Sequence, residues 1–306
     1  MLLLVKYTLI YTMVLMLVAL GGMFSERSGI INIALEGIMV IGGLVGVLVV
    51  NLIPAGASGF TIVVWSVLAA AAAGAVYACL LAFASINLKA DQTIGGTALN
   101  LLATALAMVI AKRFNGTQSS KVNFANSAFL GNIGPLSVNV FLYIGLLILV
   151  ISMIVLYRTR FGLRMRACGE HPQAADSVGN NVYNMRWAGV LISGVLGGIG
   201  GLAYIVPSVQ SWNFEVGVSG MGFLALAVMI FGQWKPSRIA LAALVFGLFR
   251  ALGNVYTGFD FLKALNLPSG VYNMLPYIIS LVILAFTSKK SRAPKAEGVP
   301  YDKGQR

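Results

Sequence analysis

The sequence predicts an all-α integral membrane protein, a polytopic helical bundle with about nine transmembrane helices and a range of eight to ten. Of its 306 residues, 58% are hydrophobic and only 10% are charged, whereas a soluble domain carries roughly 25% charged residues. The mean hydropathy is +0.88, and 35 glycines allow helices to pack closely in lipid.

The apolar runs define the elements, because a helix needs about 20 apolar residues to cross a bilayer. The runs cover 7–24, 35–53, 60–86, 93–112, 138–157, 187–207, 219–233, 238–256 and 271–288. The run at 219–233 is short enough to be re-entrant, and the long run at 60–86 is expected to be tilted or broken. The first 24 residues predict a membrane span and not a signal peptide, because the apolar run is too long and further spans follow.

The basic residues predict the topology. Five arginines lie between 158 and 186, and six basic residues follow Ser288, so we expect both regions on the cytoplasmic side by the positive-inside rule. We predict a transmembrane domain over 1–288 and a disordered basic cytoplasmic tail over 289–306. Nine spans would put the N-terminus outside, together with the polar loop 113–137. Basic residues confined to loops and tail argue against nucleic-acid binding.

The second span has an unusual entry, "SGIINIALEGIMVIGG" over 28–43. Asn32 and Glu36 are four residues apart and therefore share a helix face. One interpretation is a broken helix whose polar face lines a route for a hydroxyl-bearing substrate. The other is structural: Glu36 pairs with Arg27 or accepts hydrogen bonds from free N–H groups at the helix start. In either case we place Glu36 at or just inside the cytoplasmic boundary.

Further polar and aromatic residues complete the predicted substrate pathway. Asn100 and Thr97 form a narrow stripe with Thr93, which would either line a pore or join helices. Phe223 ends the segment 210–223, which would be an interfacial aromatic belt or an external gate. The predicted pathway residues are Asn32, Glu36, Thr97, Asn100 and Phe223.

A weak internal similarity raises the expectation of an inverted repeat. "IALEGIMVIGG" at 33–43 resembles "LALAVMIFGQ" at 224–233 without the acid. Transporters are often built from duplicated halves, although apolar sequence also matches by chance.

The segment 158–190 is the most patterned part of the chain. Within it, "EHPQAADSVG" predicts a short helix, with Pro172 in the first turn and Gly179 as its stop. Ala174 and Ala175 would leave one side flat. Such a helix either docks into a groove on another protein or lies in the lipid headgroups with the arginines as topology anchors.

This loop resembles the coupling loop of ABC importer permeases, in which two adjacent alanines are followed four residues later by glycine. "RACGEHPQAADSVGNNVYNMRWAGVLISGVLGGIGG" is similar to the branch that imports nucleosides, ribose-type sugars and branched-chain amino acids. "GIINIALEGIMVIGG", "GFLALAVMIFGQWKP" and "LPYIISLVIL" fit the nucleoside members, which depend on a lipoprotein, best. The chain departs from the family at Ala34, where glycine is usual, and at Ile38, where glutamine is common.

The resemblance implies a multi-pass permease subunit in a bacterial cell membrane, with a separate ATPase subunit docking on 169–180. The residues implied in coupling are Gly169, Glu170, His171, Pro172, Ala174, Ala175 and Gly179. Further implied partners are a second, different permease subunit, membrane lipids and an extracellular substrate-binding lipoprotein. We expect no cofactor in this chain, because ATP and Mg²⁺ would be bound by the ATPase.

No catalytic or metal site is expected. The sequence has no G-x-x-x-x-G-K-[ST] loop, so we expect no ATPase site. Its two cysteines and single histidine have no metal-ligand spacing. The remaining alternatives are an ion-driven secondary transporter, for which Glu36 and Asp91 are the available acids, and a membrane enzyme or a scaffold subunit.

Overall fold

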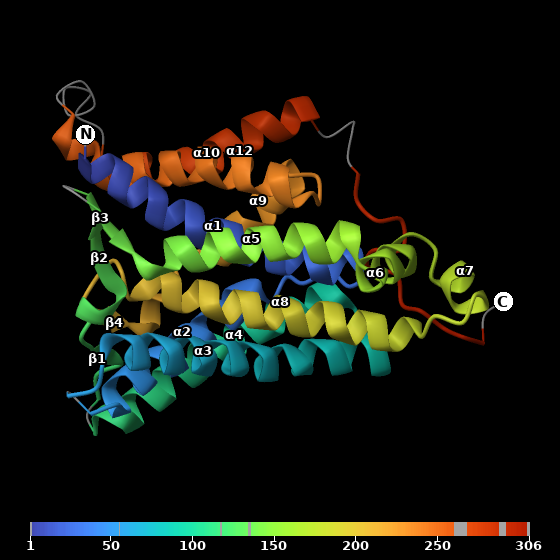
Figure 1. Ribbon diagram of the computed structural model, residues 1–306, viewed down its shortest axis with the longest axis horizontal. Helices are drawn as coiled ribbons and strands as arrows, with labels where there is room; N and C mark the ends of the chain where they lie inside the picture. Colours follow the sequence, from blue (N-terminus) through green and yellow to red (C-terminus); the bar gives the residue numbers. More distant parts are fainter. Residues whose placement is uncertain are drawn as a thin grey trace.

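The computed structural model describes residues 2–54, 56–116, 118–133, 136–259, 268–287 and 292–304. Each of the nine predicted apolar runs overlaps a helix of the bundle over most of its described length (Figure 1). Among the described residues, seven helices are long and apolar enough to cross a membrane, which confirms an all-α polytopic membrane protein. They are α1 (Leu2–Arg27), α2 (Leu35–Leu52), α3 (Gly59–Ala82), α4 (Gln92–Asn115), α5 (Val140–Arg158), α8 (Val182–Ile205) and α10 (Pro236–Val255).

The other two runs form shorter or interrupted helices. α9 (Met221–Phe231) has only 11 residues, as the short run at 219–233 suggested. α12 (Ser269–Thr287) contains Pro276. The long third run continues beyond α3 into the π-helical turn η1 (Phe83–Asn87). The last residues of this run therefore depart from regular α-helical geometry.

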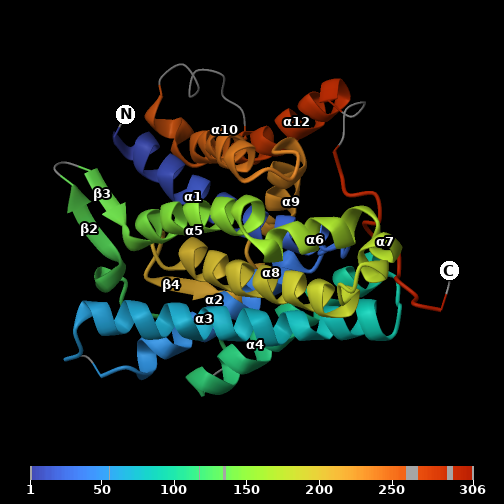
Figure 2. The same cartoon turned by 45° about the vertical axis from the view of Figure 1, so that its right-hand side comes forward.

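Helix α8 lies at the centre and packs against α1, α2 and α3 (Figure 2). Its glycine-rich second half allows this close packing. A Cβ added at Gly198 would collide with the carbonyl oxygen of Ala70 in α3. The small residues therefore serve the role expected in lipid, where close backbone contact replaces the hydrophobic effect.

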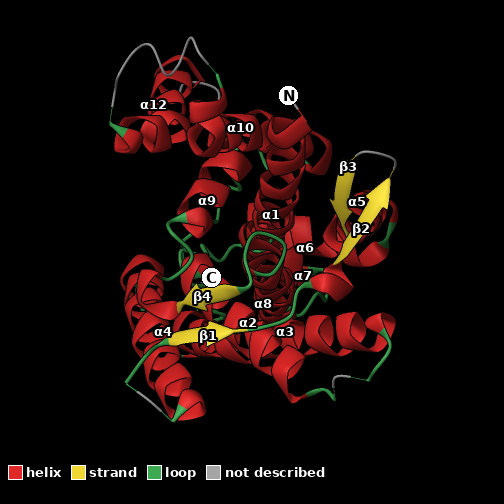
Figure 3. Cartoon of the chain, turned by 90° about the vertical axis from the view of Figure 1, so that its left-hand side faces the viewer, coloured by secondary structure: helices red, strands yellow, loops and turns green. Residues whose placement is uncertain are grey.

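One end of the bundle carries all four short strands and is called the strand end (Figure 3). β1 (Lys121–Asn123) pairs antiparallel with β4 (Ser211–Asn213), with Val122 opposite Trp212. β2 (Leu130–Ile133) pairs with β3 (Leu136–Asn139). The polar segment 113–137, expected as an open loop, thus contains strands and is tied through β1 and β4 to the segment that follows α8.

The opposite end, called the α7 end, carries two helices that follow α5. α6 (Arg160–Glu170) and α7 (Pro172–Ser177) lie there together with the C-terminus, while α1 begins at the strand end (Figure 1). The expected short helix is present as α7, with Pro172 in its first turn and Gly179 in the left-handed region at φ +83° just beyond it.

Residues 292–304 belong to the tail that was expected to be disordered. They lie in an extended path along the α7 end (Figure 1), where the N–H of Ala296 donates to the carbonyl oxygen of Gly169 at 2.9 Å. Tyr301 is buried. Contacts with elements far away in the sequence order this polar segment, and composition alone gave no sign of them. Lys289 and Lys290 lie outside the described residues.

Candidate functional site

Two irregular segments enter the bundle from opposite ends. Residues 28–34 follow α1 at the α7 end, and residues 206–220 follow α8 at the strand end. α2 then runs back to the strand end, where Asn51 donates to the carbonyl oxygen of Asn123 in β1 at 2.8 Å. α9 runs back to the α7 end. The two segments that resemble each other in sequence, 33–43 and 224–233, thus lie in α2 and α9.

Glu36 joins the first turns of these two helices. Its Oε1 accepts a hydrogen bond from the N–H of Gly220 at 2.8 Å, and its Oε2 accepts one from the N–H of Gly222 at 2.6 Å. Because both oxygens accept, the geometry fits the ionised carboxylate. Glu36 therefore lies between two helix N-termini, where the partial positive charge of each helix favours an anion.

Glu36 lies beside the start of α9, and Trp234, just beyond the other end of α9, donates to Glu26 near the end of α1. The 11 residues of α9 measure about 16 Å along the helix axis at the helical rise per residue. The predicted pairing with Arg27 is absent. Arg27 instead lies 3.6 Å from a carboxylate oxygen of Glu170 and donates to the carbonyl oxygen of Trp234 at 3.1 Å.

Amide side chains satisfy the backbone of the irregular segment 28–34. The N–H of Ile31 donates to Oε1 of Gln92 at 2.7 Å. Asn100 accepts from the N–H of Gly37 at 2.7 Å and donates to the carbonyl oxygen of Ile33 at 2.9 Å. Unpaired backbone groups in lipid cost several kcal/mol each, so these side chains make the break in the helix tolerable.

The structure brings together only part of the predicted pathway. Asn32 is fully buried and donates to Ser193 Oγ in α8 at 2.7 Å. It therefore joins the segment 28–34 to α8, and Asn100 joins the same segment to α4. Phe223 is 48% exposed and follows Gly222, directly beside Glu36. Thr97 is exposed and donates to the carbonyl oxygen of Thr93, one turn earlier in its own helix. The Thr93–Thr97–Asn100 stripe therefore divides between two faces.

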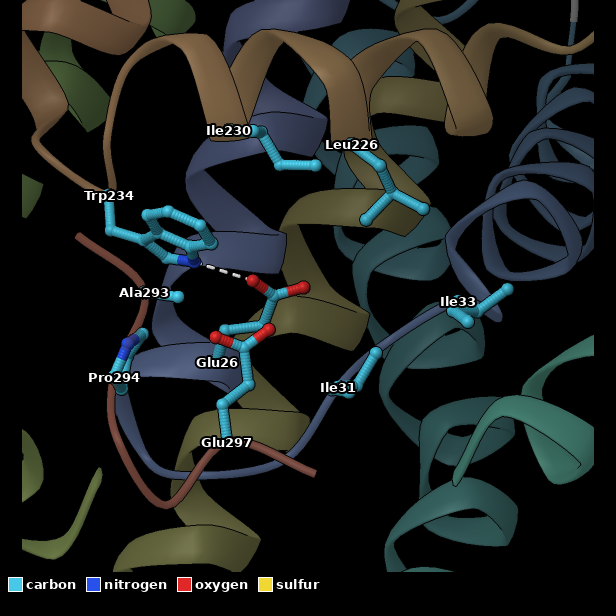
Figure 4. A pocket seen from close by; sticks show the side chains of 9 residues that line it. All are labelled: Glu26, Ile31, Ile33, Leu226, Ile230, Trp234, Ala293, Pro294 and Glu297. Carbon is cyan, nitrogen blue, oxygen red and sulfur yellow. Dashed lines mark hydrogen bonds between the residues drawn. The ribbon is translucent and has the colours of Figure 1, made fainter. Parts of the chain in front are cut away.

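A cavity of about 480 Å³ lies between the junction and the α7 end (Figure 4). Trp234 Nε1 donates to a carboxylate oxygen of Glu26 at 2.5 Å, and the carboxyl groups of Glu26 and Glu297 lie against each other (Figure 4). The residues that line the cavity are Glu26, Ile31, Ile33, Leu226, Ile230, Trp234, Ala293, Pro294 and Glu297. The sequence gave no indication of this cavity, because its wall includes the tail.

The predicted coupling residues divide into an exposed group and a buried group. His171, Ala174 and Gly179 are exposed on α7 or beside it. Ala175 and Pro172 are buried within the chain. Of the two alanines expected on the flat side of this helix, only Ala174 is exposed, because Ala175 faces the interior of the chain.

Two further residues that were predicted to take part in coupling lie where α6 contacts α1. Gly169 is buried, and a Cβ there would collide with the carbonyl oxygen of Arg27. Glu170 pairs with Arg27. Val178, the residue directly after α7, is 76% exposed, and the sequence analysis did not single it out.

No group of three or more His, Cys, Asp or Glu side chains in the described part of the chain could hold a metal ion. Cys79 and Cys168 are free thiols. Burial raises the pKa of the Cys168 thiol above its usual range, which makes it less reactive.

Comparisons with known proteins agree with this architecture. The chain is 42% identical to the nucleoside ABC transporter permease protein NupC of Lactococcus lactis, over 97% of this chain and 96% of that protein. It is 40% identical to the guanosine ABC transporter permease protein NupQ of Bacillus subtilis, over 99% and 97%. It is 26% identical to NupB, a second nucleoside ABC transporter permease of L. lactis, over 63% and 54%. No solved structure matches the chain.

The family model described as "branched-chain amino acid transport system / permease component" matches residues 4–286. That match covers all the apolar helices described above, including α2 and α9 and the α7 region between α5 and α8. The chain therefore belongs to this family of transport permease components.

Proposed function

We propose that this chain is the membrane-spanning permease subunit of a bacterial ABC importer for nucleosides. The full-length similarity to two permeases named for nucleoside and guanosine transport carries this proposal. The energy comes from ATP and Mg²⁺ bound by a separate ATPase subunit. Two relatives of this chain, NupC and NupB, come from the same organism, L. lactis, and both are named nucleoside ABC transporter permeases. This supports the pairing of this chain with a second, different permease.

The ATPase docks on α7 at the exposed face formed by His171, Ala174 and Val178. Val178 is an exposed apolar side chain and Ala174 an exposed small one, so a partner can approach this face closely, and α7 projects from the end of the bundle that carries the arginine-rich α6 (Figure 1). The positive-inside rule assigns this end, and with it the C-terminus, to the cytoplasm. The strand end then faces the external substrate-binding lipoprotein.

The junction at Glu36 is the part of the permease best placed to change between outward and inward states. It joins α2 to α9 through two hydrogen bonds, and the segments 28–34 and 206–220 precede these two helices. Irregular backbone at membrane depth occurs where it lines a cavity or is buried in protein. Phe223 at the junction exposes an aromatic ring on which a nucleobase can stack.

The ion-driven alternative would require an acid that is free to exchange a cation. Glu36 is engaged by two N–H groups. Asp91 caps α4, accepting from the N–H groups of Thr93 and Ile94 at 2.8 and 2.9 Å. Both acids therefore have structural partners, which favours an ATP-driven mechanism.

Competition uptake tests the substrate class. Cells that carry this chain and its partner subunits should accumulate labelled uridine, and excess adenosine should reduce that uptake more than excess ribose or leucine. Deletion of this chain should abolish the saturable component. Competition by ribose or leucine alone would assign the permease to the sugar or amino-acid members of the same branch.

A further inference from the structure

The C-terminal segment 292–304, here called the strap, contacts several elements at the α7 end. Near its start, Ala296 is hydrogen-bonded to Gly169 of α6, and the N–H of Gly298 donates to the carbonyl oxygen of Gly29 at 3.2 Å. Near its end, Asp302 lies 2.7 Å from Lys89 Nζ, in the turn before α4. The strap therefore connects the coupling region, the irregular segment 28–34 and the α3–α4 turn.

Tyr301 anchors the strap beneath the coupling helix. It is only 4% exposed and packs in a small apolar cluster with Cys168, Ala175 and Val182, which belong to α6, α7 and α8. Its ring also packs edge-on against Tyr183, with centroids 5.4 Å apart. Ala175, which faces away from the docking surface, thus contacts the strap, and a displacement of α7 must move Tyr301 or break this cluster.

Arg186 of α8 also holds the strap in place, through contacts with Val299 and Tyr301. Its guanidinium is 1% exposed, and its Nε and Nη2 have no hydrogen-bond partner. Nη1 donates to the carbonyl oxygen of Val299 at 3.0 Å, and the ring of Tyr301 lies 5.9 Å from the guanidinium carbon. A buried cation without partners is costly, and the strap provides both of these contacts.

The other half of the strap closes one side of the cavity in Figure 4. Pro294 and Glu297 line it opposite Ile31 of the irregular segment. The Glu297 carboxyl lies against the Glu26 carboxyl (Figure 4). Burial raises the pKa of Glu297, against the lowering effects of its hydrogen bond with Glu26 and of the Arg27 charge.

We propose that the strap is a second coupling element of the importer: it links α7 to the irregular segment 28–34 and moves Glu297 out of the cavity when the ATPase displaces α7. Tyr301 is thus a positioning residue, which acts through the strap on the inner end of the pathway. This inference rests on the proposed docking of the ATPase at α7. The alternative is a static cap that stabilises the bundle without moving.

A reversible cross-link distinguishes these roles. In a complex of this chain with its ATPase and partner permease, with Cys79 replaced by alanine, Lys89→Cys and Asp302→Cys are joined by a bismaleimide with a disulfide in its spacer. The two single-cysteine variants, treated identically, are the controls. If the strap moves, joining it to the α3–α4 turn should lower ATP-dependent uptake of labelled nucleoside by at least about fivefold, the low end of usual coupling strengths.

Reduction of the spacer should restore this uptake. Uptake by the cross-linked complex at the rate of the controls would overturn the inference and leave the proposed function intact. A loss that reduction fails to restore would also overturn it, because the strap would then be damaged by modification and not restrained. Absence of nucleoside uptake by the untreated wild-type complex would instead refute the proposed function.

Substitution of Tyr301 provides an independent test. Tyr301→Ala should lower the number of nucleosides imported per ATP hydrolysed, whereas Tyr301→Phe, which keeps the ring against Ala175 and Arg186, should preserve that ratio. A static cap predicts the same ratio in both variants, with only the amount of folded complex changed. Equal ratios in Tyr301→Ala and wild type would therefore contradict the inference.

Discussion

Replacing Glu36 by glutamine is the sharpest test of the junction between α2 and α9. The substitution keeps the size of the side chain and removes its charge. The amide oxygen can accept from only one of the N–H groups of Gly220 and Gly222, and the amide nitrogen then faces the other. Glu36→Gln should therefore weaken the attachment of α9 to α2 while leaving the surrounding packing in place.

The magnitude follows from the two hydrogen bonds of 2.8 and 2.6 Å. A bond to a charged group contributes about 1.5–3 kcal/mol, against about 1 kcal/mol for a neutral one. Losing one charged bond and converting the other to a neutral bond should cost about 2–5 kcal/mol of unfolding free energy. Glu36→Ala, which removes both bonds, should cost more.

The assay is equilibrium unfolding of the purified permease in detergent, together with nucleoside uptake by the complete complex. Glu215→Gln is the matched control, because Glu215 lies in the segment 206–220, which carries the Glu36 partner Gly220, but is exposed and accepts a hydrogen bond from Ser120. It should leave both measurements nearly unchanged. Wild-type stability and uptake in Glu36→Gln would show that the carboxylate does not hold the junction.

Three further predictions address other parts of the molecule. Val178→Glu, at the exposed tip of α7, should reduce co-purification of the ATPase subunit without changing the stability of the isolated permease; unchanged co-purification would remove Val178 from the docking face. Gly198→Leu should cost at least about 1–3 kcal/mol of stability from overpacking, whereas Gly95→Leu should be tolerated, because a Cβ there meets nothing within 4 Å; equal effects in unfolding assays would contradict the packing. Because burial raises the pKa of Glu297, strap docking should be fully favourable below the ordinary glutamate pKa and should weaken as pH rises through the raised value. A spin label at Lys303→Cys should therefore become more mobile with rising pH, and Glu297→Gln should reduce this dependence, while the neighbouring Glu26 carboxyl remains; a dependence that is unchanged in Glu297→Gln would refute it.

The sequence predicted the helices well, because apolar length is the dominant constraint in a membrane. It also predicted α7, since Pro172 and Gly179 act through local backbone geometry. It missed α6, whose arginines were interpreted only as topology anchors. It also missed the strands of 113–137, whose partner β4 is remote in the sequence.

The site was less predictable, because its contacts join residues that are distant in the chain. Glu36 was identified as a marker of a special helix entry, but its partners Gly220 and Gly222 lie more than 180 residues away. Ala175 was assigned to the docking face because the sequence could not show that Tyr301 covers it. Thr97 shares a sequence stripe with Asn100, yet only Asn100 faces the irregular segment.

The most direct test of the account is ATP-dependent uptake in proteoliposomes that contain this chain, its ATPase subunit and its partner permease, supplied with the binding lipoprotein. Labelled uridine should accumulate only when ATP is present on the α7 side, and this chain alone should accumulate none under a proton or sodium gradient. Gradient-driven uptake by the isolated chain without ATP would contradict the account.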